Sequence, residues 1–171
     1  MITLVLGGAR SGKSELAEQL AAARPGAVTY IATAVIEDAD FEDRVQAHRA
    51  RRPASWRTIE AGSSLVEALG SVPDTALVDS LGTWLAASPG FEGDVPGLLA
   101  VLSKRSGDTI VVSEEVGLGV HPSTEVGGRF RDALGALNRD VSAVADQVYL
   151  VVAGRAMRLD GPPVARPGGA R

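Results

Sequence analysis

The sequence predicts an α/β fold in which a mostly parallel central sheet is covered by helices on both faces. Short, continuous apolar runs alternate along the chain with segments that favour helix, and strands buried in a parallel sheet have this apolar character. Parallel strands also need crossover connections, which helices usually supply. A glycine-rich turn at 7–14 joins the first apolar run directly to the first helical segment, so the expected order begins with strand, loop and helix.

The length and composition predict one domain. The chain has 171 residues, 45% of them hydrophobic, which is enough for one substantial core. We expect a single domain over residues 1–159 and a disordered tail over 160–171, where three prolines and three glycines gather. No apolar run approaches the ~18 residues of a membrane helix, so we expect a cytoplasmic protein without a membrane span. The chain has no cysteine and two histidines, so metal chemistry would depend on oxygen ligands.

The individual elements follow from local pattern. Apolar, β-branched and aromatic residues predict strands at 2–6, 28–32, 76–79, 109–113 and 147–152, with shorter extended segments at 56–60 and 157–159. Helix-favouring residues or apolar residues at helical spacing predict helices at 15–23, 65–69, from near Leu81, at 98–104 and at 130–145. Residues 88–97 hold two prolines and three glycines, which is typical of a mobile loop.

The turn at 7–14 matches the phosphate-binding pattern G-x-x-x-x-G-K-[ST]. Its glycines allow successive backbone N–H groups to surround an anion, and the following helix adds the positive end of its dipole. Lys13 would reach the β- and γ-phosphates, and the Ser14 hydroxyl would bind Mg²⁺. The alternative is a plain glycine-rich turn with a solvated lysine. We predict a nucleotide site of the P-loop NTPase type, on a RecA-like sheet, formed by Gly7, Gly8, Ala9, Arg10, Ser11, Gly12, Lys13 and Ser14.

Carboxylates follow two of the expected strands. Asp79 ends an apolar strand, so in a parallel sheet it lies at the same edge as the phosphate loop and would hold Mg²⁺ opposite Ser14. The alternative is that Asp79 caps the next helix. Glu114 and Glu115 follow another strand, where one of them could orient an acceptor hydroxyl or act as a base. Because side chains alternate along a strand, only one of the two can point inward; a solvated or capping pair is the competing interpretation.

A charged segment carries one of the two histidines. Between Phe41 and Thr58 there are five arginines and two acidic residues, although the whole chain has a net charge of −4. In a helix, Arg44, His48 and Arg52 would share one face, which would favour a polyphosphate. An imidazole beside a bound phosphate can act as a nucleophile and form a phosphoramidate. Two alternatives for this segment are a solvated helix with an inert histidine and a surface whose arginines contact RNA. His121 is more consistent with a structural role.

Taken together, these blocks resemble the adenosylcobinamide kinase / adenosylcobinamide-phosphate guanylyltransferase family of cobalamin biosynthesis. The resemblance extends to about Leu159. It rests on the phosphate loop and on Tyr30-Ile31-Ala32-Thr33-Ala34, Arg44-Val45-Gln46-Ala47-His48-Arg49, Arg52-Pro53, Trp56-Arg57-Thr58-Ile59-Glu60, Asp79, Glu115-Val116-Gly117-Leu118-Gly119, Phe130-Arg131-Asp132, Gly135-Ala136-Leu137-Asn138 and Val148-Tyr149-Leu150-Val151-Val152.

The resemblance implies two reactions and a set of roles. The aminopropanol hydroxyl of adenosylcobinamide would take a phosphoryl group from ATP or GTP, and GMP would then pass from GTP to that phosphate, releasing pyrophosphate. It implies that His48 carries the GMP covalently, that Mg²⁺ takes part, and that the chain forms a homotrimer. The positions that match nucleotide or metal contacts of the family are Ala32, Thr33, Ala34, Arg49, Ala50, Arg51, Arg52, Glu60 and Asp79.

Three positions depart from the family pattern. Glu114 stands where asparagine is frequent, Arg139 where glutamine is frequent, and His121 where an apolar residue is common. The departures leave the phosphate loop and His48 intact and concern contacts to the acceptor. Two alternative functions remain beside the resemblance: another small-molecule P-loop kinase, in which His48 is inert, or a GTP-dependent regulatory switch. We expect no nucleic-acid partner, since the chain is acidic overall.

Overall fold

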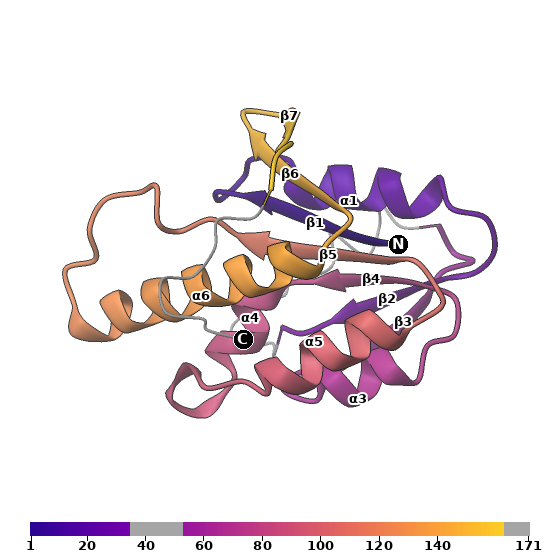
Figure 1. The fold of residues 1–171 in the computed structure, drawn as a ribbon, viewed down its shortest axis with the longest axis horizontal. Helices are drawn as coiled ribbons and strands as arrows, with labels where there is room; N and C mark the ends of the chain where they lie inside the picture. The colour runs from indigo at the N-terminus through magenta and orange to yellow at the C-terminus, as the bar shows by residue number, and fades with distance from the viewer. Residues whose placement is uncertain (35–52, 163–171) are drawn as a thin grey trace.

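The structure is a computed structural model that describes residues 1–34 and 53–162 (Figure 1). Its centre is a seven-stranded sheet in the order β3-β2-β4-β5-β1-β6-β7. All neighbouring strands are parallel except β6 and β7, which form an antiparallel hairpin at one edge. The strands are β1 (Ile2–Gly7), β2 (Val28–Ala32), β3 (Arg57–Glu60), β4 (Thr75–Asp79), β5 (Thr109–Glu114), β6 (Gln147–Val152) and β7 (Arg155–Arg158).

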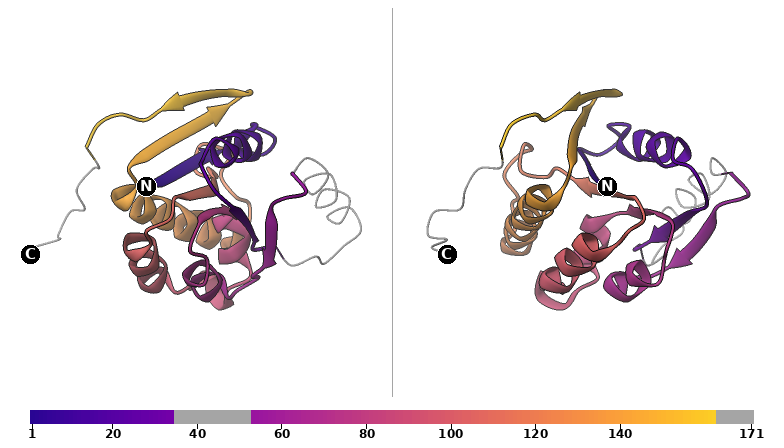
Figure 2. Two further views of the ribbon diagram at one scale, coloured as in Figure 1. Left: turned by 90° about the vertical axis from the view of Figure 1, so that its right-hand side faces the viewer. Right: turned by 45° about the vertical axis from the view of Figure 1, so that its right-hand side comes forward.

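Helices cover both faces of this sheet, as Figure 2 shows. Helix α1 (Lys13–Ala22) packs on one face, where Ala17 and Ala21 join the core formed by side chains of the central strands. The opposite face is covered by α3 (Leu65–Gly70), α4 (Leu81–Ala86), α5 (Val95–Lys104) and α6 (Glu125–Val144). The predicted α/β class with a mostly parallel sheet is therefore confirmed.

Several predicted boundaries were wrong, and capping residues explain two of them, the starts of α5 and α6. Helix α5 begins at Val95 because the Asp94 side chain accepts a hydrogen bond from the Gly97 amide. Helix α6 begins at Glu125, well before Phe130, because Thr124 caps its first turn; the glycines in that turn hide the helical signal. Residues 88–97, predicted as a mobile loop, contain a 3₁₀ turn (Pro89–Phe91) and the start of α5.

The observed ends of other helices and strands differ less from the predicted ones. Helix α1 begins at Lys13 rather than at Glu15, and β7 spans Arg155–Arg158 rather than 157–159. Most of the tail predicted to be disordered, from 163 onward, lies outside the described residues. Among the helices of 1–34 and 53–162, none has the length and apolarity needed to span a bilayer.

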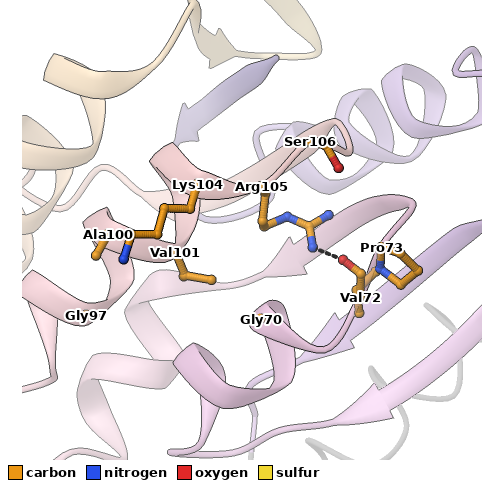
Figure 3. A pocket seen from close by; sticks show the side chains of 9 residues that line it. All are labelled: Gly70, Val72, Pro73, Gly97, Ala100, Val101, Lys104, Arg105 and Ser106. Atoms are coloured by element: carbon orange, nitrogen blue, oxygen red, sulfur yellow. Dashed lines mark hydrogen bonds between the residues drawn. The ribbon is translucent and has the colours of Figure 1, made fainter.

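Arg105 stabilises the end of the sheet that lies opposite the phosphate loop. Its guanidinium donates to the backbone carbonyls of Leu69, Val72 and Asp74, and its Nε donates to the Thr109 hydroxyl. Figure 3 shows the bond to Val72 in a pocket between the ends of α3 and α5. Burial lowers the pKa of Arg105 from its ordinary value, and the Asp74 carboxylate opposes that shift. These contacts to backbone carbonyls give Arg105 a structural role at this end of the sheet.

The Arg105→Met substitution should therefore destabilise the protein by about 2–3 kcal/mol, because several carbonyl groups would lose a charged donor. Urea denaturation measures this free energy of unfolding. The matched control is Lys104→Met, since Lys104 is an exposed neighbour at the end of α5. Equal stability of the two variants would contradict the structural role of Arg105.

Candidate functional site

The phosphate loop runs from the end of β1 to the start of α1, as the sequence predicts. Two of its residues have left-handed backbone conformations, Arg10 with φ 54° and Gly12 with φ 97°. Gly12 is the N-cap of α1 and has no side chain to bond the first amides of the helix. Those amides are thus left for an anion at the helix N-terminus. The buried Ser11 hydroxyl has no hydrogen-bond partner among the described residues.

The hairpin turn between β6 and β7 supports this loop. The Gly154 amide donates to the Ser11 carbonyl oxygen at 2.8 Å. Gly7 permits the close approach of β6, because a Cβ there would overlap the Val151 carbonyl and the Ser11 hydroxyl. This support was not predicted from the sequence; the signal for it is a glycine, Gly154, between the two extended segments expected at 147–152 and 157–159.

Lys13 lies between the loop and a carboxylate. Its Nζ is 3.4 Å from the Gly8 carbonyl oxygen and 3.7 Å from Oε1 of Glu114. The Lys13 side chain is 13% exposed, so most of it packs against the protein beside the phosphate loop. A lysine in this position is suited to bind the outer phosphates of a nucleotide.

Asp79 lies at the end of β4, at the same edge of the sheet as the loop. The Tyr30 hydroxyl donates to its Oδ2 at 2.7 Å, which fixes the orientation of the carboxylate. The N-cap of α4 is Ser80, whose side chain accepts from the Thr83 amide. Asp79 is therefore not the cap of α4, and the binding of Mg²⁺ by its carboxylate stays a prediction.

Thr33 fixes the turn between β4 and α4. Its side chain is fully buried, and its hydroxyl donates to the Ser80 carbonyl at 2.6 Å and accepts from the Ser80 amide at 2.9 Å. The Thr83 hydroxyl lies 2.6 Å from it. The position of Asp79 thus depends on contacts between the ends of β2 and β4, and contact of Thr33 with a nucleotide stays a prediction.

The two adjacent glutamates point in different directions. Oε2 of Glu114 accepts from the Ser80 hydroxyl at 2.9 Å, whereas Oε1 of Glu115 accepts from the Gly117 amide at 2.7 Å. Glu114 therefore faces the phosphate loop, and Glu115 stabilises the turn that leaves β5. This agrees with the expectation that only one of the pair points inward.

Asn138 of α6 holds the end of β5. Its Oδ1 accepts from the Ser113 hydroxyl at 2.5 Å, and its Nδ2 donates to the Glu114 carbonyl at 2.9 Å. The side chain is buried, and its bond with Ser113 is shielded from water. Asn138 thereby positions the backbone from which the Glu114 side chain projects.

The donor set at this edge fits a magnesium ion. Mg²⁺ prefers oxygen ligands and is usually held by one or two carboxylates or hydroxyls together with substrate phosphates. Ser14, in the first turn of α1, and Asp79, at the end of β4, would supply a hydroxyl and a carboxylate. No cluster of three or more metal-binding His, Cys, Asp or Glu residues occurs in the part of the chain that the structure describes.

The other predicted site residues divide into two groups. Glu60 is the last residue of β3, the strand that pairs with β2 on the side away from β4, and it is in register with Ala32. Ala34 follows Thr33 just after the end of β2. His48 and the predicted nucleotide contacts Arg49, Ala50, Arg51 and Arg52 lie outside the described residues. His121 is exposed, and its Nδ1 lies 2.8 Å from the Pro122 carbonyl oxygen.

The fold and the site together define a P-loop nucleotide-binding protein. Two solved structures share the fold: an ATPase from the type III secretion system of pathogenic bacteria (TM-score 0.57, 13% identity, 87% of this chain and 50% of that chain), and the flagellar accessory protein FlaH from Methanocaldococcus jannaschii (TM-score 0.52, 14% identity, 94% of this chain and 78% of that chain). At such low identity the likeness is one of fold alone.

The chain belongs to the cobinamide kinase / cobinamide phosphate guanyltransferase family, whose model matches residues 3–159. It is 42% identical to the bifunctional adenosylcobalamin biosynthesis protein CobP of Pseudomonas aeruginosa, over 96% of this chain and 100% of the relative. It is 33% identical to the bifunctional adenosylcobalamin biosynthesis protein CobU of Salmonella typhimurium, over 93% of this chain and 99% of that relative. The resemblance stated from the sequence is confirmed, and the chain is an enzyme of cobalamin biosynthesis.

The Lys13→Ala substitution should weaken nucleotide binding at least about tenfold, because it removes a charged contact to the phosphates. Calorimetric titration with MgGTP measures the dissociation constant. The control is Lys104→Ala, the only other lysine of the chain, which lies at the end of α5 away from the loop. Unchanged affinity of the Lys13 variant would contradict the assignment of the phosphate site.

Proposed function

We propose that this protein phosphorylates adenosylcobinamide and then transfers GMP to the product. In the first reaction the aminopropanol hydroxyl takes the γ-phosphoryl group of ATP or GTP. In the second, GMP passes from GTP to adenosylcobinamide phosphate, giving adenosylcobinamide-GDP and pyrophosphate. The observation that carries the proposal is the phosphate loop with Lys13 at its end, in a chain that matches the family over residues 3–159.

The geometry supports the kinase half through charge and position. The loop amides, the N-terminus of α1 and Lys13 offer positive charge to the triphosphate at the edge of the sheet where Asp79 ends β4. Phosphoryl transfer depends mainly on such positioning and charge stabilisation. When bound, Mg²⁺ would neutralise phosphate charge, held by the Ser14 hydroxyl and the Asp79 carboxylate.

We further propose that His48 carries GMP during the second reaction. The proposal rests on the family resemblance of the segment around His48 and on its arginines, Arg49, Arg51 and Arg52. The His48 nitrogen would attack the α-phosphorus as the bond to pyrophosphate breaks, and the acceptor phosphate would then displace the histidine. The phosphate loop would hold the departing pyrophosphate, and the arginines would offset its charge.

Labelling with GTP that carries radioactive α-phosphate tests the covalent step. After denaturation, the wild-type chain should keep a label that is stable in base and labile in acid, as expected for a phosphoramidate. The His48→Ala variant should keep none, whereas His121→Ala should be labelled like wild type because His121 is the other histidine of the chain. Absence of label from a wild-type chain that binds GTP would return His48 to an inert role, as in a simple P-loop kinase.

Three further features belong to the proposal. We propose a homotrimer because of the family resemblance, a cytoplasmic location because no apolar run of the sequence is long enough for a membrane helix, and no nucleic-acid partner because the net charge is −4. Light scattering coupled to size-exclusion chromatography measures the mass of the assembly in solution.

A further inference from the structure

We propose that Glu114 accepts the proton of the acceptor hydroxyl in the kinase reaction and has no such role in guanylyl transfer. The inference rests on the proposed function and adds a residue to it. Three properties of the Glu114 carboxylate carry it: its place in the sheet, its contacts and the space provided by Gly82.

The strand order places Glu114 in the middle of the site. Strand β5 lies between β4, which ends at Asp79, and β1, which leads into the phosphate loop. Glu114 is in register with Gly7, the first residue of that loop. The Glu114 side chain therefore starts between the proposed metal ligand and the phosphate loop, where a transferred phosphoryl group would be held.

The contacts of Glu114 hold its carboxylate in the space between Asp79 and the phosphate loop. Oε1 is 3.7 Å from Nζ of Lys13, and Oε2 accepts from the Ser80 hydroxyl at 2.9 Å. Because Lys13 binds the outer phosphates, a group beside its ammonium lies beside the γ-phosphate. The Glu114 side chain is 29% exposed, so an acceptor hydroxyl can reach it and the proton can leave to water.

Gly82 provides the space that this arrangement needs. It is buried in the first turn of α4, and a Cβ at this position would overlap Oε2 of Glu114. The same Cβ would meet Leu134 at 3.5 Å, an ordinary contact. Glycine at position 82 therefore leaves space for the Glu114 carboxylate; it is not needed to relieve backbone strain.

Other carboxylates at this edge are engaged elsewhere. Glu115 is bonded to the Gly117 amide in the turn after β5, and Asp79 accepts from Tyr30 and is assigned to the metal. Glu60 ends β3, which β2 separates from β4. Within residues 1–34 and 53–162, Glu114 is the carboxylate that forms an ion pair with Lys13.

The chemistry separates the two reactions. In the kinase reaction the acceptor oxygen forms a bond to the γ-phosphorus, its O–H bond breaks with transfer of the proton to Glu114, and the nucleoside diphosphate leaves with the electron pair of the broken P–O bond. In guanylyl transfer the acceptor is already a phosphate anion, which has no hydroxyl proton to lose on attack. A proton acceptor thus serves the first reaction alone.

The Glu114→Gln variant tests the proposal, because it keeps the size of the side chain and removes its basicity. Its kcat for phosphorylation of adenosylcobinamide should fall by about 100-fold or more. Its guanylyl transfer to previously prepared adenosylcobinamide phosphate should stay within about threefold of wild type. The matched control, Glu115→Gln, should retain both reactions.

A second variant moves the carboxylate without changing it. Gly82→Ala should lower the kinase rate and spare guanylyl transfer, since the new Cβ displaces Oε2, while alanine favours the helix. The double variant Gly82→Ala/Glu114→Gln should be no slower than Glu114→Gln alone. Urea denaturation verifies that each variant is folded.

Three results would overturn the inference. Kinase activity of Glu114→Gln within about threefold of wild type would remove the proton-accepting role. An equal loss of both reactions would show that Glu114 serves phosphate binding or stability instead. A wild-type protein that binds ATP but phosphorylates no acceptor would overturn the proposed kinase function itself and this inference with it.

Discussion

The site depends on one constraint of the sheet: three neighbouring parallel strands, β4, β5 and β1, end at the same edge. Parallel pairing brings together residues that are far apart in the sequence, because each strand delivers its last residue to that edge. Asp79, Glu114 and the phosphate loop become neighbours in this way. The hydrogen bonds of Thr33, Ser80 and Asn138 then fix the ends of these strands.

The sequence predicted the features that depend on local pattern. The alternation of apolar runs and helical segments gave the sheet and its class, and the spacing of glycines, lysine and serine gave the phosphate loop between β1 and α1. The inward direction of one of the two adjacent glutamates followed from strand alternation. The start of α6 was missed because Thr124 is followed by glycines, which have low helix propensity.

Contacts between distant segments could not be read from local pattern. The support of the loop by Gly154, the bonds of Asn138 to β5 and the fit of Glu114 over Gly82 each join segments that meet only after the sheet has formed. Strand order decides these contacts, and a single sequence does not specify it. The N-cap of α4 is a local contact by comparison: the sequence allowed Asp79 as the cap, and the structure has the neighbouring Ser80 in that role.

The central claim is that this chain carries out two successive transfers to one acceptor. The most direct measurement is a time course of the wild-type protein with adenosylcobinamide, ATP, GTP and Mg²⁺, in which mass spectrometry follows the acceptor. The account predicts that adenosylcobinamide phosphate appears first and adenosylcobinamide-GDP follows, with one pyrophosphate released per GMP transferred. An acceptor that stays unmodified while the protein binds both nucleotides would contradict it.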